Sequence, residues 1–218
     1  MSKYKGIIFD LDGTLLDTLT DLSNSVNQVL LASDFPTHSK DDYRLLIGKG
    51  FKDLITRSMP DNVNEECIEK GLTQFLEIYD RDYMKETKPY DGIMELLINL
   101  QSLDIKLAVN SNKRNDYTNE LIKKNFLNIH FIECFGERKD VPKKPDPTSA
   151  FELRNLMDLK SQEILYIGDS KTDIQTAKNA NMDSIGVLWG FRDLKELQAN
   201  GATYIAKTPE DILKIVKG

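Results

Sequence analysis

Short apolar runs alternate with helical patterns over most of this chain. The strand-like runs, each bounded by turn-forming residues, lie at residues 6–9, 106–110, 130–135, 164–167, 184–188 and 203–206. Apolar residues spaced three or four apart predict helices at residues 92–103, 116–125, 148–157, 172–180 and 209–216. Strands that alternate with helices across short loops favour an α/β fold with a doubly wound parallel sheet.

The segment from about residue 17 to residue 88 breaks this rhythm. It contains no convincing strand, and its apolar residues follow helical spacing, as in Leu19, Leu22, Val26, Val29 and Leu30 and later in Ile68, Leu72, Phe75, Leu76 and Tyr79. The turn-rich stretch at residues 88–92 marks the return to the sheet. We therefore expect an α/β core of residues 1–16 and 89–218, with an inserted helical domain at residues 17–88.

Composition and charge exclude several classes of function. The chain has 218 residues, 40% of them hydrophobic and 29% charged, which is enough to bury a substantial core. A net charge of -6 disfavours nucleic acid and anionic membranes as partners, because both require broad basic surfaces. No apolar run is long enough to span a membrane, and the first residues lack a signal-peptide core. We expect a cytoplasmic protein.

The cysteines and histidines give no sign of a metal site. Cys67 and Cys134 lie in separate segments without paired spacing, which disfavours a zinc site or a disulfide framework. His38 and His130 are also far apart, so a serine–histidine nucleophile has little support. We expect all four to be packing or surface residues.

The strongest candidate for chemistry is a pair of acids at the end of the first predicted strand. Asp10 and Asp12 follow residues 6–9 directly, and side chains alternate along a strand, so both leave it on the same side. Two like charges in a partly dry crevice need a shared proton or a nearby cation. The pair therefore predicts metal or proton chemistry.

Two further segments place polar side chains at predicted strand ends, where an open parallel sheet forms its ligand crevice. Ser111, next to Asn112, can donate a hydrogen bond to a phosphoryl oxygen, although a lone serine there is more often a helix cap. Lys144 precedes Pro145, which restricts its backbone to extended geometry and directs the ammonium from a stiff loop.

A third segment supplies acids from another predicted strand. Asp169 follows residues 164–167 and is placed to bind a hard cation together with Asp10, as Mg²⁺ prefers. Asp173, four residues later, has three alternative roles. It could be a second metal ligand, a residue that orients the metal ligands without binding the metal, or a favourable charge at the start of a helix. We favour the orienting role.

Taken together, the four segments resemble a known family. FDLDGTLLDT, NSNK, KKPDP and GDSKTD occur in this order, and the chain is similar along its whole length to the haloacid dehalogenase superfamily of phosphatases. The resemblance implies a Rossmann-like core, and the inserted helices correspond to the C1-type cap of that family. In such enzymes a cap closes over the site, excludes water and selects the leaving group.

The resemblance also implies a role for each site residue. Asp10 would be the nucleophile, and Asp12 the general acid and base. Phosphate would be held by Ser111, Asn112 and Lys144, and Mg²⁺ by Asp10, Asp169 and the backbone carbonyl of Asp12, with Asp173, Gly13 and Thr14 in support. A divalent ion and Lys144 would offset the repulsion between carboxylate and phosphate, and Gly13 would allow a sharp turn.

Within the family, the segments at residues 46–51 and 186–191 resemble phosphoglycolate phosphatases, whereas Arg114 stands where that subgroup usually has proline. We expect a Mg²⁺-dependent phosphomonoester hydrolase that acts on a small phosphorylated metabolite through an aspartyl phosphate, as a monomer or homodimer. Lys49, Lys52 and Arg57 are candidates for binding a substrate carboxylate, but we favour a surface role for them.

Three other functions remain open. A phosphomutase of the β-phosphoglucomutase type and an inorganic pyrophosphatase would use the same core. A non-catalytic phospho-aspartate signalling module also gathers acids and Mg²⁺ around a phosphorylated aspartate. That module needs no helical lid after its first strand, so we favour an enzyme.

Overall fold

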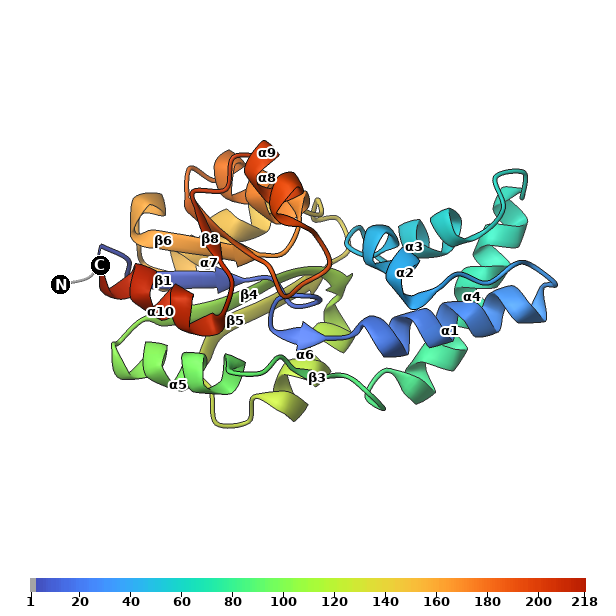
Figure 1. The fold of residues 1–218 in the computed structure, drawn as a ribbon, viewed down its shortest axis with the longest axis horizontal. Helices are drawn as coiled ribbons and strands as arrows, with labels where there is room; N and C mark the ends of the chain where they lie inside the picture. The colour runs from blue at the N-terminus through green and yellow to red at the C-terminus, as the bar shows by residue number, and fades with distance from the viewer. Residues whose placement is uncertain (1–2) are drawn as a thin grey trace.

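The computed structural model describes residues 3–218, which form a parallel sheet covered by helices and a separate helical part (Figure 1). The sheet has six strands within these residues, in the order β5-β4-β1-β6-β7-β8, and all its strand pairs are parallel. The strands are β1 (Gly6–Phe9), β4 (Lys106–Arg114), β5 (Phe131–Glu137), β6 (Ile164–Gly168), β7 (Asp183–Val187) and β8 (Tyr204–Ala206). The predicted doubly wound sheet is confirmed.

Strand β1 lies at the point where the strand order reverses. The chain runs outward from β1 to β4 and β5 on one side, and to β6, β7 and β8 on the other. In open parallel sheets the crevice for a ligand lies beyond the carboxyl ends of the strands at such a reversal. Asp10, which directly follows β1, therefore stands where the topology opens a site.

Helices cover both faces of the sheet, as the near-continuous apolar strands require. Ile7 and Phe9 of β1 pack into one apolar cluster and Ile8 into another, because neighbouring side chains on a strand face opposite ways. The first cluster includes α5 (Ile93–Ser102), α6 (Asn115–Asn125) and α10 (Pro209–Lys217). The second includes α7 (Thr148–Met157) and α8 (Lys171–Asn179), with α9 (Leu194–Ala199) beside α8.

The inserted helices, called the cap from here on, form a bundle with its own apolar core. They are α1 (Leu19–Ala32), α2 (Lys40–Leu46), α3 (Phe51–Ser58) and α4 (Glu65–Asp82), coloured from blue to teal in Figure 1. The apolar residues that predicted helices in this segment all pack into the cap cluster or against it. The expected helical insertion after the first strand is confirmed.

The two connections between the cap and the sheet run side by side. They pair as short antiparallel strands, β2 (Leu16–Asp17) and β3 (Lys88–Pro89). Beside them the buried Asp21 carboxylate accepts bonds from the backbone N–H groups of Glu86 and Thr87 and from the Thr87 hydroxyl, at 2.8–3.1 Å. We propose that the boundaries between the two domains lie in the paired strands β2 and β3, at residues 17 and 88.

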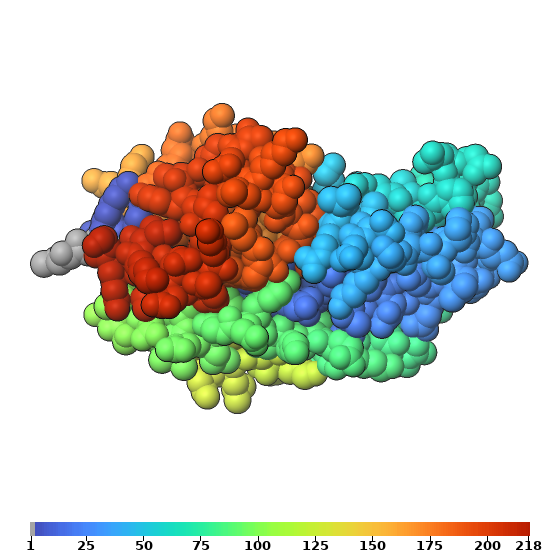
Figure 2. Space-filling view, viewed as in Figure 1, coloured from blue at the N-terminus to red at the C-terminus, as the bar shows by residue number. Residues whose placement is uncertain are grey.

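The cap also contacts the sheet domain far from its connections. Arg44 on α2 donates to the Gly190 carbonyl, and Arg192 donates to the carbonyls of Leu45 and Ile47. In Figure 2 the blue and cyan cap meets the orange segments of the sheet domain at this place. The two parts thus enclose the space above the strand ends.

Several elements differ from the sequence prediction: the short strands β2 and β3 were not expected, and β5 ends at Glu137 instead of residue 135. Strand β4 continues to Arg114, which pairs with Glu137 of β5, instead of ending at residue 110. Its last residues are polar although Ser111, Asn112 and Lys113 are buried, so no apolar run marks them as strand. Helix α9 is only six residues long, too short for a clear helical period. Among residues 3–218, no helix is long and apolar enough to cross a membrane.

Candidate active site

The turn after β1 brings its acids against the end of β6. Asp10 is buried, and its backbone N–H donates to the Ile167 carbonyl at 2.8 Å. Gly13 has φ +89, and a Cβ on it would lie 2.4 Å from an Asp169 carboxylate oxygen, so only glycine fits there. Thr14 donates its hydroxyl to Asp10 at 3.4 Å. Gly13 and Thr14 are therefore in direct contact with the acids that they were expected to support.

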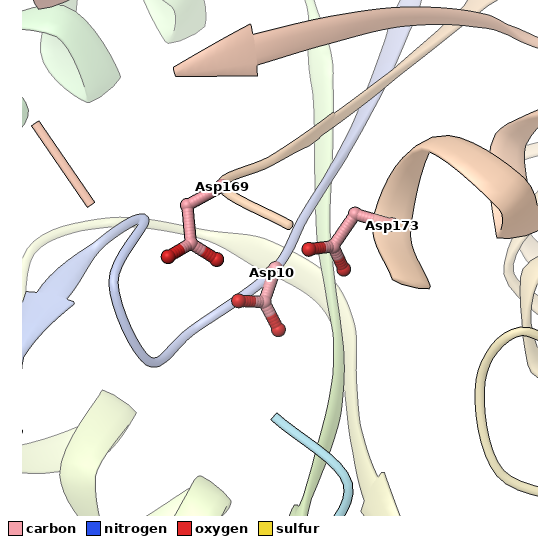
Figure 3. A group of neighbouring side chains, drawn as sticks. All are labelled: Asp10, Asp169 and Asp173. Carbon is pink, nitrogen blue, oxygen red and sulfur yellow. The ribbon is translucent and has the colours of Figure 1, made fainter. Parts of the chain in front are cut away.

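Three buried carboxylates gather at this point, as Figure 3 shows for Asp10, Asp169 and Asp173. They come from the end of β1, the end of β6 and the first turn of α8, and one oxygen of each lies within 4.8 Å of the others. Asp169 accepts the backbone N–H of Phe191 at 2.6 Å. Asp173 accepts both the backbone N–H and the hydroxyl of Ser170, which caps α8.

Burial makes these acids hard to ionise. It raises the pKa of Asp10 to about 7, with a further rise from Asp173, although the charge of Lys144 opposes it. Burial, followed by the charges of Asp10 and Asp173, raises the pKa of Asp169 well above its usual value. The cluster therefore favours either bound protons or a bound cation.

Lys144 reaches the cluster from the loop before α7. Its ammonium lies 2.6 Å from an Asp10 oxygen and 2.7 Å from an Asp173 oxygen, and its side chain is almost fully buried. Burial alone would lower the pKa of Lys144, but the two carboxylates raise it well above its usual value. Lys144 therefore carries its charge beside Asp10.

Asn112 holds this lysine by its backbone. Its carboxamide accepts the N–H of Lys144 at 2.9 Å and donates to the carbonyls of Lys144, at 3.1 Å, and Gly48, at 3.0 Å. The side chain thus ties the Lys144 loop to the cap, and the direct phosphate contact expected of Asn112 stays a prediction.

Strand β4 contributes a residue that the sequence analysis did not assign to the site. Lys113 has a fully buried side chain, and its ammonium lies 2.9 and 3.1 Å from the two oxygens of Asp12. Ser111 is two residues earlier, on the same side of an extended strand. The alternation of side chains along a strand could have predicted that Lys113 lies on the same side as Ser111. It was not applied there because the strand was expected to end before Ser111.

All these side chains face one pocket between the cap and the sheet domain. Of the predicted site residues, its walls contain Asp10, Asp12, Ser111, Asn112, Lys144, Asp169 and Asp173. The cap contributes mainly apolar walls, among them Leu22, Ile47, Phe51 and Leu54. Phe191 and Arg192, from the loop after β7, complete the pocket, and Arg192 is a second residue that the sequence analysis missed.

Residues 7–187 match the family model of haloacid dehalogenase-like hydrolases. The chain belongs to this family. A phosphoglycolate phosphatase from Vibrio parahaemolyticus is 29% identical over 97% of this chain and 96% of its own length. Another from Mesorhizobium japonicum is 32% identical, over 86% of this chain and 84% of its own. This haloacid dehalogenase-like hydrolase is thus an enzyme related to phosphatases.

Solved structures agree over the entire fold. A candidate phosphoglycolate phosphatase from Lactobacillus delbrueckii superposes with a TM-score of 0.94 at 32% identity and covers 100% of both chains. A predicted phosphoglycolate phosphatase from Haemophilus somnus gives 0.90 at 26% identity, over 99% of both chains. The hydrolase therefore shares both the sheet domain and the cap with these proteins.

The charges of the hydrolase pocket fit a divalent cation. In the part of the chain that the structure describes, four pocket carboxylates (Asp10, Asp12, Asp169 and Asp173) meet only the ammonium groups of Lys113 and Lys144 in ion pairs. Even when the Arg192 guanidinium in the pocket wall is counted, four carboxylates face three cations, so negative charge is left over in a buried place, which is costly without a counter-ion. Carboxylate oxygens are also the ligands that Mg²⁺ prefers, so the donor set suits this ion.

Proposed function

We propose that this hydrolase is a Mg²⁺-dependent phosphomonoesterase that cleaves a small phosphorylated metabolite through an aspartyl phosphate formed on Asp10. The observation that carries the proposal is the position of Asp10, which faces the pocket between the acid cluster and the Lys144 ammonium. A carboxylate placed beside a cation can approach a phosphate dianion that would otherwise repel it.

In the first step, Asp10 attacks phosphorus while Lys144 and Ser111 hold the phosphoryl oxygens. A new O–P bond forms to Asp10, and the bond to the leaving oxygen breaks. Asp12, which pairs with Lys113 in the free pocket, takes up a proton as the phosphorylated substrate binds and gives it to the leaving oxygen, so that a neutral alcohol departs. Covalent catalysis thereby divides one difficult displacement into two easier ones.

In the second step, Asp12 takes a proton from water, and that water attacks the phosphorus of the aspartyl phosphate. The bond to Asp10 breaks, inorganic phosphate leaves, and Asp12 is again protonated. The burial of the pocket under the cap keeps other water away from the reacting atoms.

Asp10, Asp169 and the backbone carbonyl of Asp12 would hold Mg²⁺ in this proposal. The bound ion would shield negative charge on the phosphoryl group as it forms and breaks bonds. Asp173 is assigned the orienting role, because its oxygens already bind Lys144 and Ser170. Asn112 is assigned to hold the Lys144 loop.

The substrate proposed is a phosphorylated small acid such as phosphoglycolate, the compound in the names of the relatives. Lys52 pairs with Glu65 and Glu69, and Arg57 binds the carbonyls of Leu45 and Leu46, so neither serves the pocket. Arg192 does line it. Its Nη2 and Nε are engaged by cap carbonyls and by Glu196, but its buried Nη1 has no acceptor among residues 3–218. We therefore assign the substrate carboxylate to Arg192. We also propose that the enzyme is cytoplasmic and that it is a monomer or a homodimer.

Phosphate release from a panel of compounds tests this function. We expect the purified enzyme to release phosphate from phosphoglycolate and p-nitrophenyl phosphate with Mg²⁺ and not with EDTA. Asp10→Asn should lower turnover by at least about 10³-fold, because an amide is a poor nucleophile. The Asp10→Asn protein should still unfold cooperatively, which serves as the folding control.

Three results would overturn the proposal. Isomerisation of a sugar phosphate without phosphate release would support the mutase, and preferred cleavage of pyrophosphate would support the pyrophosphatase. A long-lived phosphoprotein without turnover would support a signalling module.

A further inference from the structure

The buried ammonium of Lys113 joins the two domains of the enzyme. On one side it contacts both oxygens of Asp12, at 2.9 and 3.1 Å. On another side it lies over the rings of Phe51 and Tyr79, 5.4 and 5.2 Å from their centroids. Phe51 begins α3 and Tyr79 lies in α4, so both rings belong to the cap, whereas Asp12 and Lys113 belong to the sheet domain. We call these four residues the lysine cage.

We propose that Lys113 is a positioning residue, which holds the Asp12 carboxylate in its reactive orientation while the cap rings enclose the ammonium. This inference rests on the proposed function, in which Asp12 moves protons in both steps. Contact with both oxygens holds the carboxyl group beside the ammonium, because a turn of the Asp12 side chain about its Cα–Cβ bond would carry both oxygens away from Lys113. The orientation of the acid therefore depends on Lys113.

The cap rings make this arrangement stable without water. An aromatic face attracts a cation, and the attraction is larger when the cation is desolvated. The Lys113 side chain has no exposed area, so the two rings take the place of part of its hydration. If the rings withdrew, water would reach the ammonium and weaken its attraction to Asp12, since a higher dielectric reduces a Coulomb interaction. Asp12 is thus held most firmly when the cap is closed.

The rings themselves are held in place across the domain boundary. Tyr79 packs against Phe51, Phe75 and Tyr117, with centroids 5.1–5.3 Å apart. Tyr117 lies on α6 of the sheet domain, so the aromatic contacts bridge the two domains. The Tyr79 hydroxyl has no partner among the described residues. Tyr79 therefore serves the cage through its ring face and not through its hydroxyl.

A purely structural role explains the cage less well. Replacing a buried ion pair by apolar residues of similar size is often neutral or stabilising, because burying charges is costly. A contact needed only to join the domains could be made by apolar side chains, as in the rest of the cap core. The buried charge pair is explained by what it does to Asp12.

The test compares two substrates with different needs for a proton. An alkyl phosphate such as phosphoglycolate expels a basic alkoxide and needs Asp12 as an acid. p-Nitrophenyl phosphate expels a stable phenolate and does not. The measured quantity is kcat/KM, which reports the steps up to departure of the leaving group and excludes later hydrolysis of the aspartyl phosphate.

The variants form a matched set. Tyr79→Phe keeps the ring face and removes only the unpartnered hydroxyl, whereas Tyr79→Leu and Phe51→Leu each remove a ring, and Lys113→Met removes the charge. We expect Tyr79→Phe to match the wild type within about twofold on both substrates. The other three should lose at least about tenfold more in kcat/KM for the alkyl phosphate than for p-nitrophenyl phosphate, because general acid catalysis contributes about 10²–10⁴-fold. Comparing the two substrates within each variant removes the effect of a changed pocket wall, which Phe51→Leu and Lys113→Met also produce.

A second readout follows the later step. Asp12 also activates water, so the three cage variants should accumulate phosphoprotein from p-nitrophenyl phosphate after an acid quench, and Tyr79→Phe should not. A variant that merely packs badly would lose both substrates alike and accumulate nothing. The Phe51 and Tyr79 variants keep the test decisive if Lys113→Met does not fold.

The outcomes separate this inference from the proposed function. An active wild type whose cage variants lose both substrates equally, or lose neither, overturns the positioning role alone. A wild type that releases phosphate from neither substrate overturns the proposed function and this inference with it.

Discussion

At the scale of single residues, each charged side chain of the site depends on a neighbouring charge or hydrogen bond. Asp10 lies between the Lys144 ammonium and the other buried acids, so its pKa reflects both. Asp12 is paired with Lys113, and Asn112 holds the backbone of Lys144. Arg192 stands apart, because its Nη1 is buried and has no acceptor in residues 3–218.

This arginine leads to a prediction about substrate choice. Arg192→Gln should lower kcat/KM for phosphoglycolate by about 10–100-fold, because a charge-assisted hydrogen bond contributes about 1.5–3 kcal/mol. Cleavage of p-nitrophenyl phosphate, which has no carboxylate, should change by less than about threefold. Lys52→Gln is the control and should alter neither, because Lys52 only pairs with glutamates on the cap surface. Equal losses on both substrates would contradict the assignment.

At the scale of elements, the site depends on where strands end and on how the cap is attached. Strands β1, β4 and β6 lie side by side, so residues far apart in the chain meet at their carboxyl ends. The paired connections β2 and β3 carry the cap, and Asp21 at the start of α1 ties residues 86 and 87 to that helix. The hinge of the cap is thus a bonded structure, not a loose linker.

Removing the charge of Asp21 should loosen this hinge. In Asp21→Asn, part of the carboxylate is replaced by an N–H₂ group that faces the backbone N–H donors of Glu86 and Thr87. We expect a loss of about 2–3 kcal/mol in the free energy of unfolding, the cost of leaving buried polar groups unpaired. Urea denaturation measures this loss, and replacement of the exposed Glu77 of α4 in Glu77→Gln should change stability by less than about 0.5 kcal/mol. Similar values for the two variants would refute the bonded hinge.

At the scale of the whole molecule, two domains enclose a pocket in which the described residues leave an excess of negative charge. The sheet domain supplies the acids and the lysines, and the cap supplies apolar walls and the rings of the lysine cage. A cation bound in this pocket would neutralise the excess charge, so cation binding should stabilise the folded enzyme.

Stability should depend on pH and Mg²⁺ together. The pKa values of Asp10 and Asp169 are raised in the folded protein, so the metal-free folded state binds more protons than the unfolded chain. Their contribution to stability therefore falls as pH rises from the usual aspartate value of 3.8 towards about 7. Mg²⁺ competes with these protons, so its stabilising effect should grow over the same range.

Thermal melts at pH 5 and pH 8 measure this effect. At pH 8 and a concentration about 100-fold above its Kd, Mg²⁺ should raise the Tm by about 5–10 °C, and at pH 5 by clearly less. Asp169→Asn should remove most of the increase at pH 8. An equal increase at both pH values would show that these acids do not bind the ion.

Much of this protein was predictable from local pattern. The strand at residues 6–9, the helical insertion and the four polar segments depend on side-chain spacing over a few residues, which the sequence displays directly. Because parallel strands bring their carboxyl ends together, the pattern also placed Asp10, Ser111, Lys144 and Asp169 at one edge of the sheet. The structure brings all four into one pocket.

The tertiary structure alone decided how distant residues pair. Lys113 meets Asp12 across 101 positions, and Lys144 meets Asp10 across 134. The rings of Phe51 and Tyr79 reach Lys113 only because the cap folds back over the strand ends. Local spacing determines which face of an element a side chain occupies, but the packing of whole elements determines which faces meet. For that reason the sequence by itself predicted which acids lie at the site, whereas only the fold assigned Asp10 and Asp12 each its cation.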